Sequence, residues 1–134
     1  MKNLIKKTVA SLLVLSSLFL VQSAFAIGLG EIVVESAVNQ PFRARIPLLK
    51  PGSLNEMQII GQMASEEAFA KHNLTRDRIY STIKFRVDLN HKQGPSLVLT
   101  SEQPIKEPAL NFLVELSWPS GSIMRSYSAL LAKP

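Results

Sequence analysis

Few residues in this sequence have the type and spacing that catalysis or metal binding requires. The two histidines, His72 and His91, have no second histidine or carboxylate at ligand spacing, whereas a zinc site needs three or four ligands. The sequence contains no cysteine, so thiol chemistry, thiolate metal ligands and disulfide bonds are excluded. We therefore expect no metal site, no cofactor and no catalytic residues.

Hydrolytic chemistry has little support from local motifs. Serines are frequent, but none lies in a Gly-x-Ser-x-Gly elbow that would present a nucleophile to a base. Glu66 and Glu67 are adjacent, yet the dipole of a predicted helix explains them without catalysis. Gly28 and Gly30 are not followed by a phosphate-loop lysine. Carboxylates distant in sequence could still meet as a glycosidase pair, so a small envelope hydrolase stays as an alternative of a different class.

The candidate binding residues lie on the most regular predicted strand and the turn after it. Asn111 and Glu115 alternate with apolar neighbours, so they lie either on a solvated outer face or against a partner. Trp118 is the only tryptophan and precedes Pro119 at a turn. It either packs in the core or anchors a partner, since tryptophan is enriched in binding hot spots. These four residues are our candidate partner-binding site.

The first 26 residues have the three zones of a secretory signal peptide. Lys2, Lys6 and Lys7 are basic, Val9 to Val21 are mainly apolar, and Ala24-Phe25-Ala26 places small residues where signal peptidase reads them. We expect cleavage after Ala26, which makes Ile27 the new N-terminus.

The alternative to cleavage is an uncleaved membrane anchor, because residues 8–30 carry no charge and could just span a bilayer. The absence of a cysteine after the site excludes a lipid-anchored lipoprotein. The short basic signal suits a bacterial exporter, so we expect a periplasmic protein. No second apolar stretch reaches membrane-spanning length, so no membrane span is expected after cleavage.

Composition argues against a nucleic-acid partner. Removal of the signal leaves twelve basic and ten acidic residues, a net charge of about +2. No basic cluster larger than Arg43-Ala44-Arg45 remains, whereas nucleic-acid binding requires a clustered basic face. Residues 27–134 are enough for one domain with one core.

Alternation of apolar and polar residues predicts a mainly β fold. Seven or so short strands separated by turns favour an immunoglobulin-like β-sandwich with one short helix. That helix follows Ser65 as N-cap, packs through Phe69 and stops at Asn73. Pro47 is expected to confine its strand to an edge or a bend. The expected strands are 31–38, 42–46, 54–63, 79–89, 97–99, 108–118 and 123–131.

Three sets of segments, in order along the whole of residues 27–134, resemble one protein family. The first set is GLGEI (28–32), SAVNQP (36–41) and ARIPL (44–48). The second is ASEEAFA (64–70) and IKF (83–85). The third is TSEQPIKEP (100–108), NFLVE (111–115), WPSG (118–121) and YSALL (127–131). The chain resembles the N-terminal periplasmic domain of the FimV family, also called the TspA or HubP family, of pilus-assembly and cell-pole organising proteins.

The resemblance implies a non-enzymatic interaction or scaffold module in type IV pilus assembly, twitching motility or cell-pole organisation. Its partners would be envelope or pilus-assembly proteins. In that family this domain usually precedes a peptidoglycan-binding LysM module, a transmembrane helix and a long cytoplasmic part, and nothing in this sequence matches those. Peptidoglycan or glycan binding is therefore kept only as the alternative within binding proteins.

Overall fold

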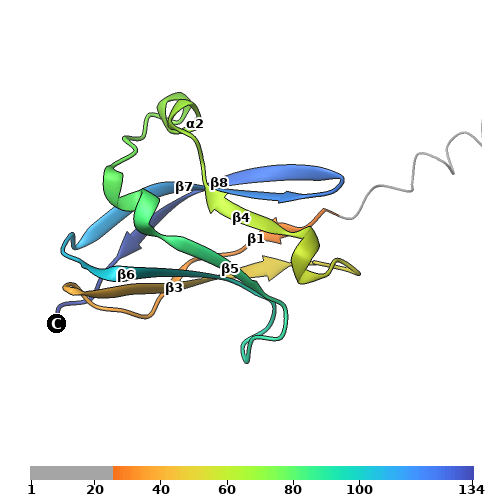
Figure 1. Ribbon diagram of the computed structural model, residues 1–134, viewed down its shortest axis with the longest axis horizontal. Coiled ribbons are helices and arrows are strands. Elements are labelled where there is room, and N and C mark those ends of the chain that lie inside the picture. The colour runs from red at the N-terminus through yellow and green to blue at the C-terminus, as the bar shows by residue number, and fades with distance from the viewer. Residues whose placement is uncertain (1–25) are drawn as a thin grey trace, which may run out of the picture.

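Two antiparallel β-sheets pack face to face across one apolar core in the computed structural model (Figure 1). The structure describes residues 26–134, so most of the predicted signal segment, Ala24 included, lies outside the described residues. The larger sheet has the strand order β1-β3-β6-β5, with β2 also paired to β3, and the smaller has the order β4-β7-β8. The prediction of an immunoglobulin-like all-β sandwich is confirmed.

Most strands follow the alternation that predicted them. The larger sheet contains β1 (Gly28–Leu29), β2 (Val33–Val34), β3 (Gln40–Leu49), β5 (Lys84–Asp88) and β6 (Ser96–Ile105). The smaller sheet contains β4 (Ile60–Met63), β7 (Ala109–Trp118) and β8 (Gly121–Leu130). In β3 the buried residues Phe42, Ala44 and Ile46 alternate with the outward-facing Arg43 and Arg45, as expected.

The prediction that Pro47 confines its strand to an edge or a bend is wrong. Strand β3 continues to Leu49 and is internal, with β1 and β2 on one side and β6 on the other. The carbonyl of Pro47 accepts a hydrogen bond from the Gly30 N–H at 2.8 Å on the β1 and β2 side. The N–H and C=O of a strand residue point to the same side. The missing N–H of Pro47 therefore falls in the gap between the two short strands, where the ladder is already interrupted.

Three other expected strands have different bounds in the structure. The expected strand 31–38 contains only β2 and an isolated bridge from Ala37 to Ala132. The first part of 54–63 is a 3₁₀ helix, η1 (Glu56–Gln58), because Asn55 caps it through a reciprocal capping box with Gln58. The first part of 79–89 is a second 3₁₀ helix, η2 (Arg78–Thr82). Short apolar stretches are ambiguous by periodicity alone, which explains these errors.

The one α-helix within residues 26–134, α2 (Glu66–Lys71), has the predicted start and stop signals. The Ser65 hydroxyl accepts a hydrogen bond from the Ala68 N–H at 3.2 Å, and Asn73 adopts the left-handed conformation with φ of 56°. Phe69 is fully buried. A helix of two turns is unstable alone in water, so the contact made by Phe69 holds α2 against the sandwich.

A row of four aromatic rings runs through the core. The ring centroids of Phe69, Tyr80, Phe112 and Tyr127 are separated in turn by 6.0, 5.7 and 6.3 Å. Such tilted pairs contribute about 0.5–1.5 kcal/mol each beyond their burial. The row joins α2 and η2 to β7 and β8, so the helical connection is part of the core.

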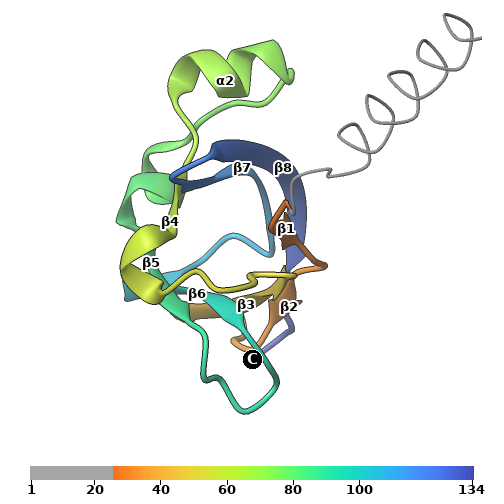
Figure 2. The same ribbon diagram turned by 90° about the vertical axis from the view of Figure 1, so that its right-hand side faces the viewer.

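The N-terminal segment is fastened to β8, which brings the first strand against the smaller sheet (Figure 2). The Tyr127 hydroxyl donates to the Gly30 carbonyl at 2.8 Å. The Arg125 guanidinium lies over the Tyr127 ring, donates to the Leu29 carbonyl at 2.8 Å and contacts the Glu31 carboxylate at 2.7 Å. These contacts close the sandwich along the edge of β8.

We predict that Gly61→Ala destabilises the protein by about 1–2 kcal/mol, the usual effect of overpacking a core. A Cβ at Gly61 would lie only 2.5 Å from the nearest Leu97 methyl group of the opposite sheet. The matched control is Gly28→Ala, whose Cβ would meet Leu49 at an ordinary 3.4 Å. Urea unfolding measures both, and equal free energies of unfolding for the two variants would contradict the close approach of the sheets.

Stability should also fall at alkaline pH. Burial raises the pKa of Tyr127 from 10.0 to about 12, and the Arg125 charge opposes this shift only in part. Burial also raises the pKa of Tyr80. The unfolded chain loses these protons at lower pH than the folded chain does. The resulting stability is present below pH 10 and is lost as the pH rises through about 12.

The measurement is urea unfolding between about pH 8 and about pH 11, near the range where tyrosine titrates. Tyr127→Phe should be less stable at the lower pH by about 1 kcal/mol, because the Gly30 carbonyl loses its donor. It should also lose less stability than the parent as the pH rises. A parallel pH dependence in the two proteins would show that Tyr127 does not titrate as described.

Candidate functional site

The four residues predicted for partner binding do not all line one hollow. Asn111 and Glu115 lie on the outer face of β7, about 13 Å apart at the usual rise of a strand. The Asn111 side-chain oxygen accepts a hydrogen bond from Ser128 at 2.7 Å, and Glu115 accepts one from Gln62 at 2.8 Å. Both side chains therefore link neighbouring strands of the smaller sheet.

Trp118 lies at the end of β7 and is half-buried against the core. One side of Trp118 packs inward and the other borders a surface hollow, so its role as an anchor for a partner stays a prediction. A Cβ at Gly121 would come within 3.2 Å of its ring, so the turn holds the indole in place. Pro119 beside it is exposed.

Trp118 and Pro119 join residues from η1 and β4 in a hollow of about 380 Å³. We call this surface the Trp118 patch, and its residues are Met57, Gln58, Ile60, Ser117, Trp118 and Pro119. Met57 is 93% exposed and Ile60 is 57% exposed, although both are large and apolar. Exposed apolar groups that gather at one place mark interaction surfaces.

Sequence reasoning did not identify Met57 and Ile60 as parts of this site. The irregular alternation in 54–63 was the available signal, because an apolar residue out of phase with its strand has to face solvent or a partner. Trp118 and Pro119 lie about sixty positions further along the chain, and only the pairing of β4 with β7 brings them to Ile60.

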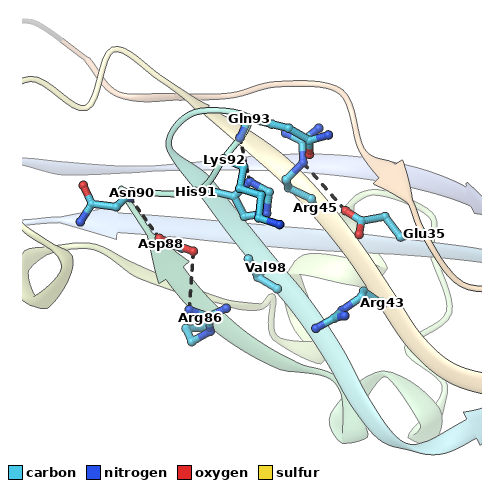
Figure 3. Close-up of a pocket in the computed structure, with 10 residues that line it drawn as sticks. All are labelled: Glu35, Arg43, Arg45, Arg86, Asp88, Asn90, His91, Lys92, Gln93 and Val98. Atoms are coloured by element: carbon cyan, nitrogen blue, oxygen red, sulfur yellow. Dashed lines mark hydrogen bonds and ion pairs between the residues drawn. The ribbon is translucent and has the colours of Figure 1, made fainter.

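A second hollow, of about 540 Å³, lies on the outer face of the larger sheet (Figure 3). We call it the charged pocket, after its lining residues Glu35, Arg43, Arg45, Arg86, Asp88 and Lys92. The arginines come from β3 and β5, and Val98 of β6 lies between them because it pairs with both Arg45 and Arg86.

The loop from Leu89 to Pro95 forms one wall of the charged pocket. The Asp88 carboxylate accepts a hydrogen bond from the Asn90 N–H at 3.0 Å, and Gly94 has a φ of 100° that favours glycine. These two features turn the chain back into β6 and place His91, Lys92 and Gln93 at the pocket rim.

The histidines make local contacts with the backbone. His72 contacts the Ala68 carbonyl through Nδ1 at 2.8 Å, and His91 Nδ1 accepts from the Gln93 N–H at 3.1 Å. Across residues 26–134 no three histidine, cysteine or acidic side chains gather in a way that could hold a metal ion. In the same residues, no helix has both the length and the apolar character needed to cross a membrane.

Among the acidic side chains, one resolved pKa shift has a simple structural cause. Lys84 donates to Glu102 at 2.6 Å across β5 and β6, and this hydrogen bond lowers the pKa of the exposed Glu102 carboxyl. The two raised tyrosine pKa values belong to the core. None of the three groups lines the Trp118 patch or the charged pocket.

Comparison with known proteins places this architecture in a family. The FimV N-terminal Ig-like domain family matches residues 27–134. Motility hub protein FimV of Pseudomonas aeruginosa, from strains PAO1 and UCBPP-PA14, is 39% identical over 111 residues. The aligned region covers 83% of this chain and 12% of each relative, so the chain spans a small part of their length. No solved structure matches significantly. The resemblance seen in the sequence is confirmed, and the chain belongs to the FimV N-terminal domain family.

Proposed function

We propose that this protein is a non-enzymatic interaction module that serves motility or pilus assembly in the bacterial envelope. Membership of the FimV N-terminal domain family supports the setting, because the matched relatives are named motility hub proteins. The single structural observation that carries the proposal is the Trp118 patch, where apolar side chains face solvent beside a half-buried tryptophan.

The Trp118 patch has the composition of a binding hot spot. Tryptophan and methionine are enriched at interfaces, and covering a large apolar side chain contributes about 1.5–3 kcal/mol. Met57 and Ile60 are exposed, so a partner could bury both. The patch lies at the end of β4 and β7. The occupant we propose is an apolar segment of a pilus-assembly or other motility protein of the envelope.

The proposed location is the periplasm, reached by cleavage after Ala26. Support comes from the basic, apolar and small-residue zones of the first 26 residues. Ile27 is 3% exposed and belongs to the core, whereas Ala26 is exposed. Within residues 26–134, the first buried residue is thus the one that follows the predicted cleavage site.

Site-specific photo-crosslinking in living cells tests the partner. A photoreactive residue at Met57 should capture a motility or pilus-assembly protein of the envelope, and Met57→Glu with Ile60→Thr should reduce twitching motility. These changes remove exposed apolar contacts while they keep a helix former in η1 and a β-branched residue in β4. Loss of two such contacts should weaken binding at least tenfold, given about 1.5 kcal/mol for each.

Leu130 provides the matched control because it is 75% exposed, apolar and on β8, away from the Trp118 patch. A photoreactive residue there should not capture the same partner, and Leu130→Thr should leave motility unchanged. Equal capture from Met57 and Leu130 would contradict the patch as the binding site. Capture of cell-wall glycan alone would instead favour the glycan-binding alternative.

Export can be tested independently of the partner. Mass spectrometry of the protein purified from the periplasmic fraction should give an N-terminus at Ile27. Ala26→Trp should block processing, because signal peptidase requires a small residue there. Recovery of a mature N-terminus elsewhere would contradict cleavage after Ala26, and recovery of only the unprocessed chain, in the membrane fraction, would favour the membrane-anchor alternative.

A further inference from the structure

We infer that the charged pocket binds a carboxylate of an acidic peptide segment, at a site separate from the Trp118 patch. The two surfaces share no residue, since the pocket lies on β2, β3, β5, β6 and the loop from Leu89 to Pro95. The inference therefore does not depend on the function proposed for the Trp118 patch.

Arg45 carries the main argument because its side chain is largely buried and one of its donor nitrogens is buried without a hydrogen-bond partner. Its side chain is only 10% exposed, and its Nε has no hydrogen-bond partner among the described residues. The nearest carboxylate oxygen, Glu35 Oε1, is 3.9 Å from this nitrogen, which is an ion pair but too long for a hydrogen bond. A buried cationic donor left in this state is costly, and an added anion in the pocket would reduce that cost.

The neighbours of Arg45 add positive charge to the same face. Arg43 and Arg86 point to the pocket from the strands on which they lie, and Lys92 lies on its rim (Figure 3). Asp88 contacts Arg86 at 3.7 Å, while Arg43 and Lys92 form no ion pair within residues 26–134. Four cationic side chains face two carboxylates, so the pocket has an uncompensated positive charge.

The lining favours a carboxylate over a phosphate. Charge alone does not decide between the two ligands, because the four cationic side chains outnumber Glu35 and Asp88 and attract either anion. Arginine guanidinium groups match the planar carboxylate through paired hydrogen bonds. Val98, which is 7% exposed, supplies an apolar floor for the methylene groups of a glutamate or aspartate side chain.

An acidic peptide fits the position of the pocket better than a small free acid. The hollow is formed on the outer face of a sheet and is bordered by an exposed loop, so a chain can pass over it while one side chain enters. Each acidic side chain of such a segment would add a weak charge contact with the protein, whereas a small free acid makes only the contacts of its one carboxylate.

The test is an NMR titration of the ¹⁵N-labelled protein. The protein is purified as the cells produce it, with no segment removed afterwards. The Arg45 Nε–Hε signal, assigned by its loss in Arg45→Lys, is followed as acetyl-Glu-Glu-Glu-amide is added at low ionic strength. The same titration is made with acetyl-Gln-Gln-Gln-amide and with inorganic phosphate. We expect the glutamate peptide to shift the signal in a saturable manner that weakens with added salt.

The variants distinguish a defined site from general attraction to a basic protein. Arg43→Gln should weaken binding of the glutamate peptide by about fivefold or more, since it removes a charge-assisted contact. Arg78→Gln removes the same charge from η2, outside the pocket, and should change the dissociation constant less than about twofold. Both positions are exposed, so both variants should fold.

Four results would overturn the inference. The Arg45 signal could fail to move with the glutamate peptide, or the glutamine peptide could move it equally. Phosphate could bind as tightly as the glutamate peptide, which would assign the pocket to anions in general. Equal weakening by Arg43→Gln and Arg78→Gln would show that net charge alone attracts the peptide.

Discussion

The structure depends on the contact between its two sheets, which no disulfide bond supports. The aromatic row from Phe69 to Tyr127 fills the core and links the helical connection to the smaller sheet. Its last member, Tyr127, also holds the N-terminal segment through the Gly30 carbonyl. Both candidate binding surfaces lie on strands that this packing fixes in place. The positions of Trp118 on one sheet and Arg45 on the other therefore follow from burial and hydrogen bonding alone.

Much of the fold could be predicted because alternation in strands and capping in helices are local properties. Ser65 and Asn73 identified α2, and Phe42, Ala44 and Ile46 identified the buried face of β3. The errors arose where distant pairing decides the outcome. Pro47 is tolerated inside β3 because β1 and β2 leave a gap opposite it.

The candidate site was only partly predictable for the same reason. Trp118 and Pro119 were chosen from residue type and turn position. Met57 and Ile60 reach them only through the register that pairs Ile60 with Ser117. Arg43 and Arg45 were recognised as a pair, but Arg86 joins them across β6, and the burial of the Arg45 side chain depends on the surrounding fold. Sequence alone does not show which distant residues either surface brings together.

The chain enters the domain beside the Trp118 patch. Ile27 and Trp118 line one small hollow, and Figure 1 shows the C-terminus at the opposite end of the sandwich. An affinity tag or fluorescent protein fused ahead of Ile27 would therefore sit next to the surface proposed to dock a partner and could obstruct it sterically. A fusion after Pro134 leaves that end open. The choice of terminus thus decides whether a labelled version of this protein reports on its interactions or suppresses them.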